Sequence, residues 1–414
     1  MAELPRFSAP HPLGLPANRY SHPVRVLGKG AFGEVYLCFI RKEHPNGVQY
    51  EPVAVKIYQP IQPGNERMLE MLRREVECQG SLHHPHVISL REVGITGVAD
   101  RIYLNLEFAD SGTLKQLLAA RGGRLTEGEA RWYTQQLVYG MAYCHAQGVF
   151  NRDIKPDNLL LHRGGLTWPL LKVSDFGLCK STGHSAPHSL VGSLHYMAPE
   201  VIIRVVSSSG NGDNEKYDGR KVDVFSCGIV LYQMIFGALP FNRAPDGRPL
   251  EYKYREDRET FLDNMRLDRW TQLIPRSVLA PPPAPAGGGG GGQDEALQKQ
   301  GGQQQPQQQQ QLPPVHLNPA LIDLLSGMLR YDAAQRMTLR DVMMHPWYCY
   351  GLPAEYHAML LKAGTEARPA GEVRRSQTKE EIAEIFARLS RRLGSQNAAA
   401  AAAVCSDDDD AEAY

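Results

Sequence analysis

Two short stretches carry side chains that suit the transfer of a phosphoryl group. In NRDIKPDN (151–158), Asp153 can accept a hydroxyl proton, Lys155 can neutralise a phosphoryl group, and Asn158 can ligate a divalent cation. Further along the chain, Asp175 in KVSDFG supplies a second oxygen ligand. Hard cations with bound phosphates need only one or two such protein ligands. The set favours in-line phosphoryl transfer, which depends on positioning and charge neutralisation; the alternative is a polar surface turn.

Three glycines could let backbone N–H groups approach phosphates. Gly28, Gly30 and Gly33 lie in LGKGAFGEVYL, where the missing Cβ atoms leave room for an anion. A dinucleotide-binding fold uses the same spacing, but there the glycines open a helix. Here they precede EVYLCFI, whose composition favours a strand. We expect a glycine-rich hairpin bend over phosphates, with an ordinary hairpin turn as the alternative.

One lysine and one glutamate lie in apolar patterns and could form an ion pair. Lys56 alternates with the apolar residues of VAVKIY, and an unpaired buried ammonium is costly. Glu75 lies on the apolar stripe of a helix expected over 66–80. A Lys56–Glu75 pair would aim the ammonium at a phosphate; the alternative is two independent surface charges.

The elements that must position these residues fall into two groups. Short β-branched and aromatic runs from 20 to 106 predict strands, interrupted by the helix at 66–80. Helical periodicity dominates from 113 to 349, and Thr126 and Glu129 fit a capping box. The segregation predicts a two-lobed α+β protein. We place the small lobe at 20–109 and the large lobe at 110–349.

Composition narrows the functional classes. The 414 residues are 42% hydrophobic and 22% charged, which is enough for a sizeable core. The formal net charge is zero, so charge gives no reason to expect nucleic acid or an anionic membrane as partner. The seven cysteines form no Cys-x-x-Cys pair, as expected in a reducing compartment. No signal core or spanning segment is evident, so we expect a cytoplasmic protein that could also enter the nucleus.

Four segments have the composition of disordered chain: residues 1–19, the polar insert 207–216, the Pro-, Gly- and Gln-rich insert 280–314, and the Ala- and Asp-rich tail 395–414. Between the last two lies an extension, 350–394, in which residues 378–393 form an amphipathic helix pattern. This helix could dock on the two lobes as an autoinhibitory element, bind a regulatory partner such as calmodulin, or pack permanently on the large lobe. Autoinhibition would mean that deleting 370–414 raises basal activity.

These motifs, in this order over residues 20–349, resemble those of eukaryotic serine/threonine protein kinases, most closely the calcium/calmodulin-dependent and AMP-activated kinase group. The resemblance implies a bilobal kinase fold, ATP and Mg²⁺ at the site, protein substrates and an upstream activating kinase. Lys155 matches serine/threonine rather than tyrosine kinases. Thr113 stands where the group often has a glutamate that reads a basic residue of the substrate.

The resemblance also implies roles for individual residues. Asp153 matches the catalytic base, with Lys155 and Lys56 as catalytic cations, and Asn158 and Asp175 match the magnesium ligands. The positions that match ATP contacts are Leu27, Gly28, Lys29, Gly30, Ala31, Phe32, Gly33, Val35, Ala54, Lys56, Glu75, Glu107, Ala109, Asn158, Leu160 and Asp175. Leu106 matches the gatekeeper position beside the adenine site, Glu200 would pair with Arg336, and Asp223 opens the helix that anchors the catalytic loop.

The catalytic loop departs from the family pattern at one position. Asn151 replaces the usual histidine, whose side chain stacks under the phenylalanine that is Phe176 here. Because asparagine is smaller and polar, we expect a looser active state. The same departure supports the alternative of a pseudokinase scaffold. A small-molecule kinase is a third reading, disfavoured by the full activation segment through MAPE.

Arg152 and Ser189 are the candidate regulatory residues. An arginine beside a catalytic base stays poorly compensated until an anion arrives, and a phosphorylated activation loop supplies one. Ser189 is the best-placed acceptor, with Ser185 and Thr182 behind it. The alternative is that Arg152 pairs with a local acid.

Overall fold

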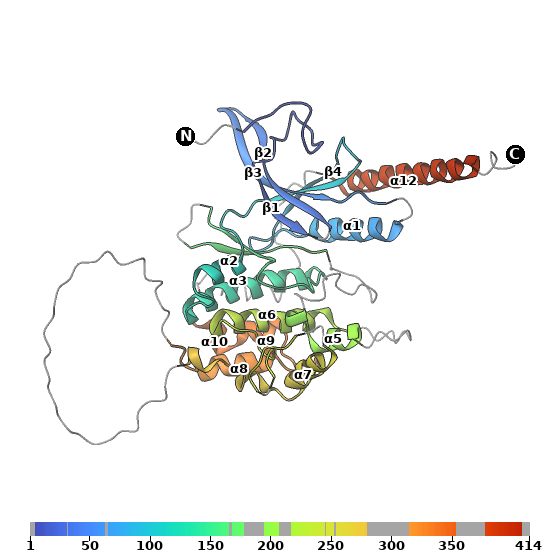
Figure 1. The fold of residues 1–414 in the computed structure, drawn as a ribbon. Helices are drawn as coiled ribbons and strands as arrows, with labels where there is room; N and C mark the ends of the chain where they lie inside the picture. The colour runs from blue at the N-terminus through green and yellow to red at the C-terminus, as the bar shows by residue number, and fades with distance from the viewer. Residues whose placement is uncertain are drawn as a thin grey trace, which may run out of the picture.

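The computed structural model describes residues 5–30, 32–62, 65–164, 168–177, 194–206, 217–244, 246–251, 254–279, 314–352 and 377–407. A sheet-rich small lobe lies above a helical large lobe, which confirms the predicted α+β fold (Figure 1). Among the described residues, no helix combines the length and the apolar character that crossing a membrane requires.

The small lobe is built on a five-stranded antiparallel sheet in the order β1-β2-β3-β5-β4. Its strands are β1 (Arg25–Gly30), β2 (Gly33–His44), β3 (Gly47–Tyr58), β4 (Leu90–Ile95) and β5 (Ile102–Glu107). The predicted helix is α1 (Glu66–Gln79), which Asn65 caps. Val53, Val55 and Ile57 of β3 are buried, as their alternation predicted.

The N-terminal segment packs on this sheet instead of forming the disordered arm expected over 1–19. Leu15 and Tyr20 are buried in one cluster with β2, β3 and β5. The hydroxyl of Tyr20 donates to Glu92 at 3.0 Å, and the backbone N–H of Gly97 donates to the carbonyl of Gly14 at 2.7 Å. Apolar residues spaced between prolines can cover a sheet face without regular secondary structure, which composition did not reveal.

The large lobe is helical around α3 and α6. Its elements are α2 (Leu114–Ala120), α3 (Glu127–Ala146), β6 (Leu159–His162), β7 (Leu170–Val173), α5 (Pro199–Val206), α6 (Gly219–Phe236), α7 (Arg255–Arg266), α8 (Pro319–Met328), α9 (Leu339–Met344), α10 (Pro346–Cys349) and the short 3₁₀ helices Leu194–Tyr196, Arg269–Thr271 and Arg276–Val278. Almost every residue of α6 is buried, so it forms the centre of this lobe. Thr126 and Glu129 form the predicted capping box of α3.

The C-terminal helix α12 (Lys379–Asp407) differs from the expectation in two ways. It extends well beyond residue 393 into the tail expected to be disordered, because the alanine run 398–403 has a high helix propensity. It also packs on α1 and β4 of the small lobe, so the alternative of a helix on the large lobe is wrong (Figure 1). The segment 207–216 and all but the last residue of the segment 280–314, both expected to be disordered, lie outside the described residues.

Candidate active site

The catalytic loop between α3 and β6 gathers three of the predicted residues. The ammonium of Lys155 donates to both carboxylate oxygens of Asp153, at 2.9 and 2.7 Å. The side-chain amide of Asn158 donates to the Asp153 carboxylate at 2.8 Å and to its backbone carbonyl at 2.9 Å. With its NH₂ group committed to two acceptors, Asn158 keeps its amide oxygen for another ligand.

The environment of Asp153 strengthens it as a proton acceptor. Burial raises the pKa of its carboxyl above the ordinary value, although the charge and hydrogen bonds of Lys155 act in the opposite direction. A carboxylate with a raised pKa takes a proton more readily near neutral pH. The arrangement therefore fits the base role that the sequence predicted for Asp153.

The backbone of the catalytic loop is held by Asp223, which is completely buried in α6. The backbone N–H groups of Asn151 and Arg152 donate to its two carboxylate oxygens at 3.0 and 2.7 Å, and His145 lies 2.8 Å from one of them. Arg152 has φ of 65°, a left-handed conformation that costs energy for a residue with a Cβ. Asp223 thus anchors the loop as predicted, and its hydrogen bonds offset the strain.

Asn151 forms polar bonds where a looser packing was expected. Its side chain is completely buried. The amide nitrogen donates to the carbonyl of Asp175 at 3.0 Å, and the amide oxygen accepts from the N–H of Asp153 at 3.1 Å. A short side chain that can donate and accept therefore ties the base to the segment that carries Asp175, beside the buried Phe176.

Lys56 joins the small lobe to this site. Its ammonium donates to Glu75 at 2.8 Å, which is the predicted ion pair, and lies 3.7 Å from Asp175. Burial acts to lower the pKa of Lys56, but the carboxylates of Glu75 and Asp175 outweigh it and raise the pKa well above the ordinary value. Conversely, Lys56 lowers the pKa of the Asp175 carboxyl against the effect of burial. The pair keeps Lys56 charged at the position where a phosphate would bind.

The glycines of the β1–β2 hairpin have two different roles. A Cβ on Gly28 would meet no atom within 4 Å, so the space above it is open. A Cβ on Gly33 would lie 2.1 Å from the carbonyl oxygen of Ile57, so Gly33 is required for packing against β3. The hairpin itself, with Gly30 paired to Gly33, confirms the strand prediction over a helix. Ala31 lies outside the described residues.

The predicted adenine contacts come from neighbouring strands. Val35 pairs with Lys56 across β2 and β3, and Ala54 pairs with Leu106 across β3 and β5. Leu160 of β6 forms a bridge with Thr113 at the start of α2. The other residues that the sequence predicted to contact ATP are Leu27, Lys29, Phe32, Glu107 and Ala109. The contacts of these residues with ATP are proposals.

Lys172 was not predicted from the sequence, and it binds Glu107, one of the predicted ATP contacts. Its ammonium lies 2.7 Å from the carboxylate of Glu107 and donates to the carbonyl of Pro85 at 2.7 Å. The Glu107 side chain therefore points to β7, and only its main chain remains for a nucleotide. The reasoning applied to Lys56 could have found Lys172, since it too is a lysine in an apolar strand.

Asp175 and Asn158 fit a magnesium ion that also binds phosphates. Each offers an oxygen, and the described residues contain no cluster of three or more acidic, histidine or cysteine ligands. Mg²⁺ bound to a nucleotide takes one or two protein carboxylates or amides and fills the rest of its shell with phosphate and water. Asp175 adopts φ of 58°, a second strained residue at this site.

The large lobe contains the predicted ion pair between Glu200 and Arg336. Two parallel bonds of 2.8 and 2.9 Å join the guanidinium to the carboxylate, and Arg336 is 1% exposed. This pair fixes α5, which follows the activation segment. The candidate phosphorylation sites Ser189, Ser185 and Thr182 lie outside the described residues.

Comparison with known proteins shows which family this chain resembles. The family described as protein kinase domain matches residues 21–348. The serine/threonine-protein kinase SRK2D of Arabidopsis thaliana is 31% identical over 349 residues, 83% of this chain and 76% of that protein. SAPK9 of Oryza sativa subsp. japonica is 32% identical over 333 residues, covering 80% and 72%.

CBL-interacting protein kinase 30 of the same rice is 36% identical over 260 residues, 62% of this chain and 48% of that protein. The chain spans about half the length of the CBL-interacting relatives that it matches. The matched range, the order of the motifs and the paired residues agree, and this chain therefore belongs to the protein kinase family, beside serine/threonine kinases of the group that its sequence resembles.

Proposed function

We propose that this protein transfers the γ-phosphoryl group of ATP to serine and threonine hydroxyls of protein substrates. One observation carries the proposal: Lys56 lies 2.8 Å from Glu75 of the small lobe and 3.7 Å from Asp175 of the large lobe. The nucleotide-binding lysine, its partner and a metal ligand are thus assembled together, as phosphoryl transfer requires.

Each residue then has a task. Asp153 accepts the proton of the attacking hydroxyl, and Lys155, bonded to the same carboxylate, stabilises charge on the phosphoryl group in transfer. Lys56 holds the α- and β-phosphates. Mg²⁺ on Asn158 and Asp175 would neutralise the remaining phosphate charge. Because catalysis here is mainly positioning, the bonds that fix these side chains matter as much as their chemistry.

Thr113 stands at the position where related kinases often have a glutamate that binds a basic residue of the substrate. Thr113 caps α2, and its hydroxyl accepts from the backbone N–H of Gln116 at 3.2 Å. A threonine used for capping cannot attract a basic residue of the substrate. We therefore propose substrates that are not selected by an arginine at that subsite.

We further propose that phosphorylation of the activation loop, with Ser189 as first acceptor, activates the enzyme. The guanidinium groups of Arg152 and Arg204 lie 5.3 and 6.0 Å from the centre of the Tyr217 ring. These two guanidinium groups lie on one ring and bring positive charge to one place, which supports a binding site for the phosphate of the activation loop. An upstream kinase would supply the phosphate, and Ser189→Ala should then lower activity after treatment with such a kinase.

The alternative function, a pseudokinase scaffold, was suggested by Asn151 in place of the usual histidine. The bonds of that side chain to Asp175 and Asp153 support a catalytic arrangement, and no described observation favours the scaffold. A regulatory partner, as the names of the CBL-interacting relatives state for those proteins, remains a proposal for this chain. Such a partner would have to displace α12 from α1 if it bound the apolar face of α12.

The test is incorporation of labelled phosphate from ATP into a mixed protein substrate. Wild type should label the substrate, and Asp153→Asn should label it roughly 10²–10⁴-fold more slowly while still binding ATP. Asp263→Asn, an exposed carboxylate of α7 that pairs with Arg266, is the matched control and should behave as wild type. Binding of ATP without any transfer that depends on Asp153 would overturn the proposed function and favour the scaffold.

A further inference from the structure

A charged pair joins helix α2 to the catalytic loop near the base. The ammonium of Lys115, in the first turn of α2, donates to the carboxylate of Asp157 at 2.7 Å. The backbone N–H of Lys115 also donates to the carbonyl of Pro156 at 3.2 Å. Both side chains remain open to solvent, with 65% of the Lys115 side chain and 43% of the Asp157 side chain exposed. The pair is therefore held against the loop and accessible to a substrate.

Asp157 lies within a few residues' reach of the base. Its chain neighbour Asn158 donates to the Asp153 carboxylate at 2.8 Å. The carboxylates of Asp153 and Asp157 are therefore on the order of 10 Å apart, a length that about three residues of extended peptide cover. A substrate whose acceptor hydroxyl meets Asp153 would place a residue within three positions of that acceptor next to the Lys115–Asp157 pair.

Asp157 also lies close to the end of the activation segment. Burial, and to a smaller extent the nearby Asp157 carboxylate, raises the pKa of Tyr196 above its ordinary value. Tyr196 belongs to the short turn before MAPE, and its hydroxyl donates to Gln233 of α6 at 2.8 Å. Contacts with α2 and with this segment place Asp157 on the face of the large lobe that the catalytic loop and the activation segment share.

The neighbouring polar side chains of α2 cap the helix. The Thr113 hydroxyl accepts from the N–H of Gln116, and the Gln116 side chain accepts from the N–H of Thr113 at 3.0 Å. Lys115 is the one charged residue in LKQLLAA and takes no part in this capping box. A cation in the first turn opposes the helix dipole, and an exposed ion pair adds little stability. These observations leave the neutralisation of Asp157 as the main effect of Lys115.

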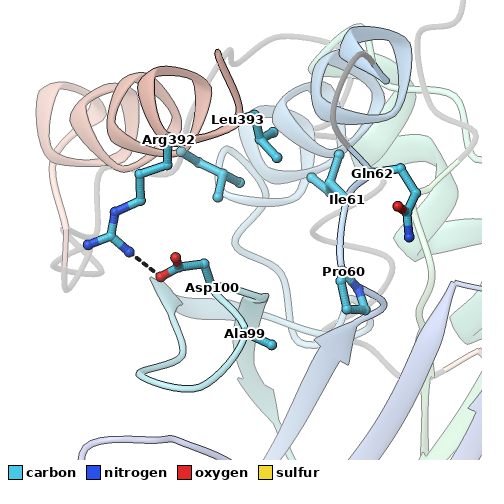
Figure 2. A pocket seen from close by; sticks show the side chains of 8 residues that line it. Pro60, Ile61, Gln62, Ala99, Asp100, Arg392 and Leu393 are labelled. Atoms are coloured by element: carbon cyan, nitrogen blue, oxygen red, sulfur yellow. Dashed lines mark hydrogen bonds and ion pairs between the residues drawn. The ribbon is translucent and has the colours of Figure 1, made fainter. Parts of the chain in front are cut away.

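A second exposed ion pair has a different setting. Arg392 of α12 pairs with Asp100 of the β4–β5 loop, and both line a pocket of about 270 Å³ (Figure 2). The residues that line this pocket belong to α12, to this loop and to the connection after β3. That pair therefore ties α12 to the small lobe and involves neither α2 nor the catalytic loop.

We propose that Lys115 is a specificity-determining residue that neutralises Asp157, so that the enzyme does not select substrates by a basic residue near the acceptor. A carboxylate so close to the acceptor would by itself attract arginine or lysine. The ammonium of Lys115 cancels that charge, and the position that meets the pair accepts basic, acidic and uncharged residues alike. The proposal rests on the proposed function. It adds to the role of Thr113, because Thr113 only lacks a charge, whereas Asp157 carries one that Lys115 masks.

The test compares synthetic peptides that differ in one residue. Each carries one serine acceptor and Arg, Gln or Glu at one of the three positions before or after it, and kcat/KM is measured with the full chain at saturating MgATP. Wild type should use the three peptides alike, within about 2-fold. Lys115→Met keeps the apolar stem but exposes the Asp157 charge, and should prefer Arg over Glu roughly 5-fold at one or more positions. Asp157→Asn exposes the Lys115 charge and should shift the preference in the opposite direction, towards Glu.

Further variants separate charge selection from a structural role. The double variant Lys115→Met, Asp157→Asn should lose both preferences, and Lys115→Arg should keep the wild-type ratio. Lys42→Met removes a matched exposed lysine, which pairs with Glu51 in the β2–β3 hairpin, and should also keep the wild-type ratio. The Arg preference of Lys115→Met should shrink between about 50 and about 500 mM salt, because salt screens exposed charges.

Three results would each overturn the inference: a clear charge preference already present in wild type, equal losses on all three peptides in Lys115→Met, or shifts in the same direction for Lys115→Met and Asp157→Asn. Labelling that depends on Asp153 but shows none of these shifts would overturn the inference alone. A wild type that labels neither the peptides nor a mixed protein substrate would overturn the proposed function, and the inference with it.

Discussion

The catalytic loop and α1 are positioned by different kinds of interaction. The loop is tied by short hydrogen bonds to Asp223, a buried carboxylate of the central helix of its own lobe. Helix α1 carries Glu75, and its apolar side chains share one cluster with Phe386 and Leu389, about three hundred residues further along the chain. Hydrogen bonds to a buried charge fix direction and distance, whereas apolar packing allows a helix to shift. The catalytic loop is thus held by hydrogen bonds within its own lobe, whereas α1 is held by apolar packing that includes α12.

Among the variants that test this comparison, Asp223→Asn should have the largest effect. An amide offers one oxygen where the carboxylate accepts from Asn151, Arg152 and His145, so at least one buried N–H group would lose its partner. We expect kcat to fall on the order of 100-fold with little change in KM for ATP, because the loop moves and α1 does not.

Asp218→Asn is the control for that variant. Asp218 is half-buried and caps the same helix, and asparagine caps as well as aspartate. Wild-type kcat is expected for it. A large rise in KM for ATP in Asp223→Asn would contradict the separation between the two regions.

Asn151→Ala should come next. This substitution removes the completely buried side chain that bonds to the N–H of Asp153 and to the carbonyl of Asp175, so both groups lose that partner. The cost of such a loss is about 1–3 kcal/mol, and we expect kcat to fall roughly 10-fold. Steady-state kinetics and thermal unfolding measure the two quantities.

Asn151→His restores the residue usual in the family and serves as the matched variant. Histidine can also donate and accept, so activity should remain close to that of wild type. If Asn151→Ala were as active as wild type, the polar bonds of this side chain would have no part in positioning the base.

A smaller effect is expected for Leu389→Ala. The cavity left in the α1–α12 cluster weakens the hold on α1, so KM for ATP should rise about 5-fold while kcat at saturating ATP stays within about 2-fold. Ser390→Ala, an exposed neighbour on α12, is the control. A fall in kcat without a change in KM for ATP would show that α12 acts on the catalytic loop. That result would contradict the separate positioning of the loop and α1.

The smallest effect concerns the pH dependence of stability. Lys56 lowers the pKa of Asp175 in the folded protein, so its carboxylate contributes stability that is fully present above its ordinary pKa of about 4 and is lost as the pH falls through the lowered pKa. Asp175→Asn should therefore be less stable than wild type at pH 7. The difference should shrink as the pH falls below about 4, as urea unfolding at several pH values would show. A difference independent of pH would contradict an ion pair with Lys56.

The site residues could be read from the sequence because phosphoryl transfer constrains residue type and spacing within short stretches. Asp153, Lys155 and Asn158 lie in one loop, and hydrogen bonds within that loop bring them together. Lys56 and Glu75 were found because each is a charge in an apolar pattern, and only a partner resolves that conflict. The strands and α1 followed from their periodicity in the same way.

The tertiary structure decided what the local pattern leaves open. An apolar stripe states that a helix buries one face, but not against which surface, and so the sequence did not place α12 on α1. For the same reason, the sequence did not predict the burial of Tyr20 in the N-terminal segment or the contact of Tyr58 with Lys56. The interpretation of Asn151 used only its size and polarity, because its partners are backbone groups that any sequence carries. The chain's own order of residues thus determined the chemistry and the two lobes, while long-range apolar packing and backbone partners determined how that chemistry is held in place.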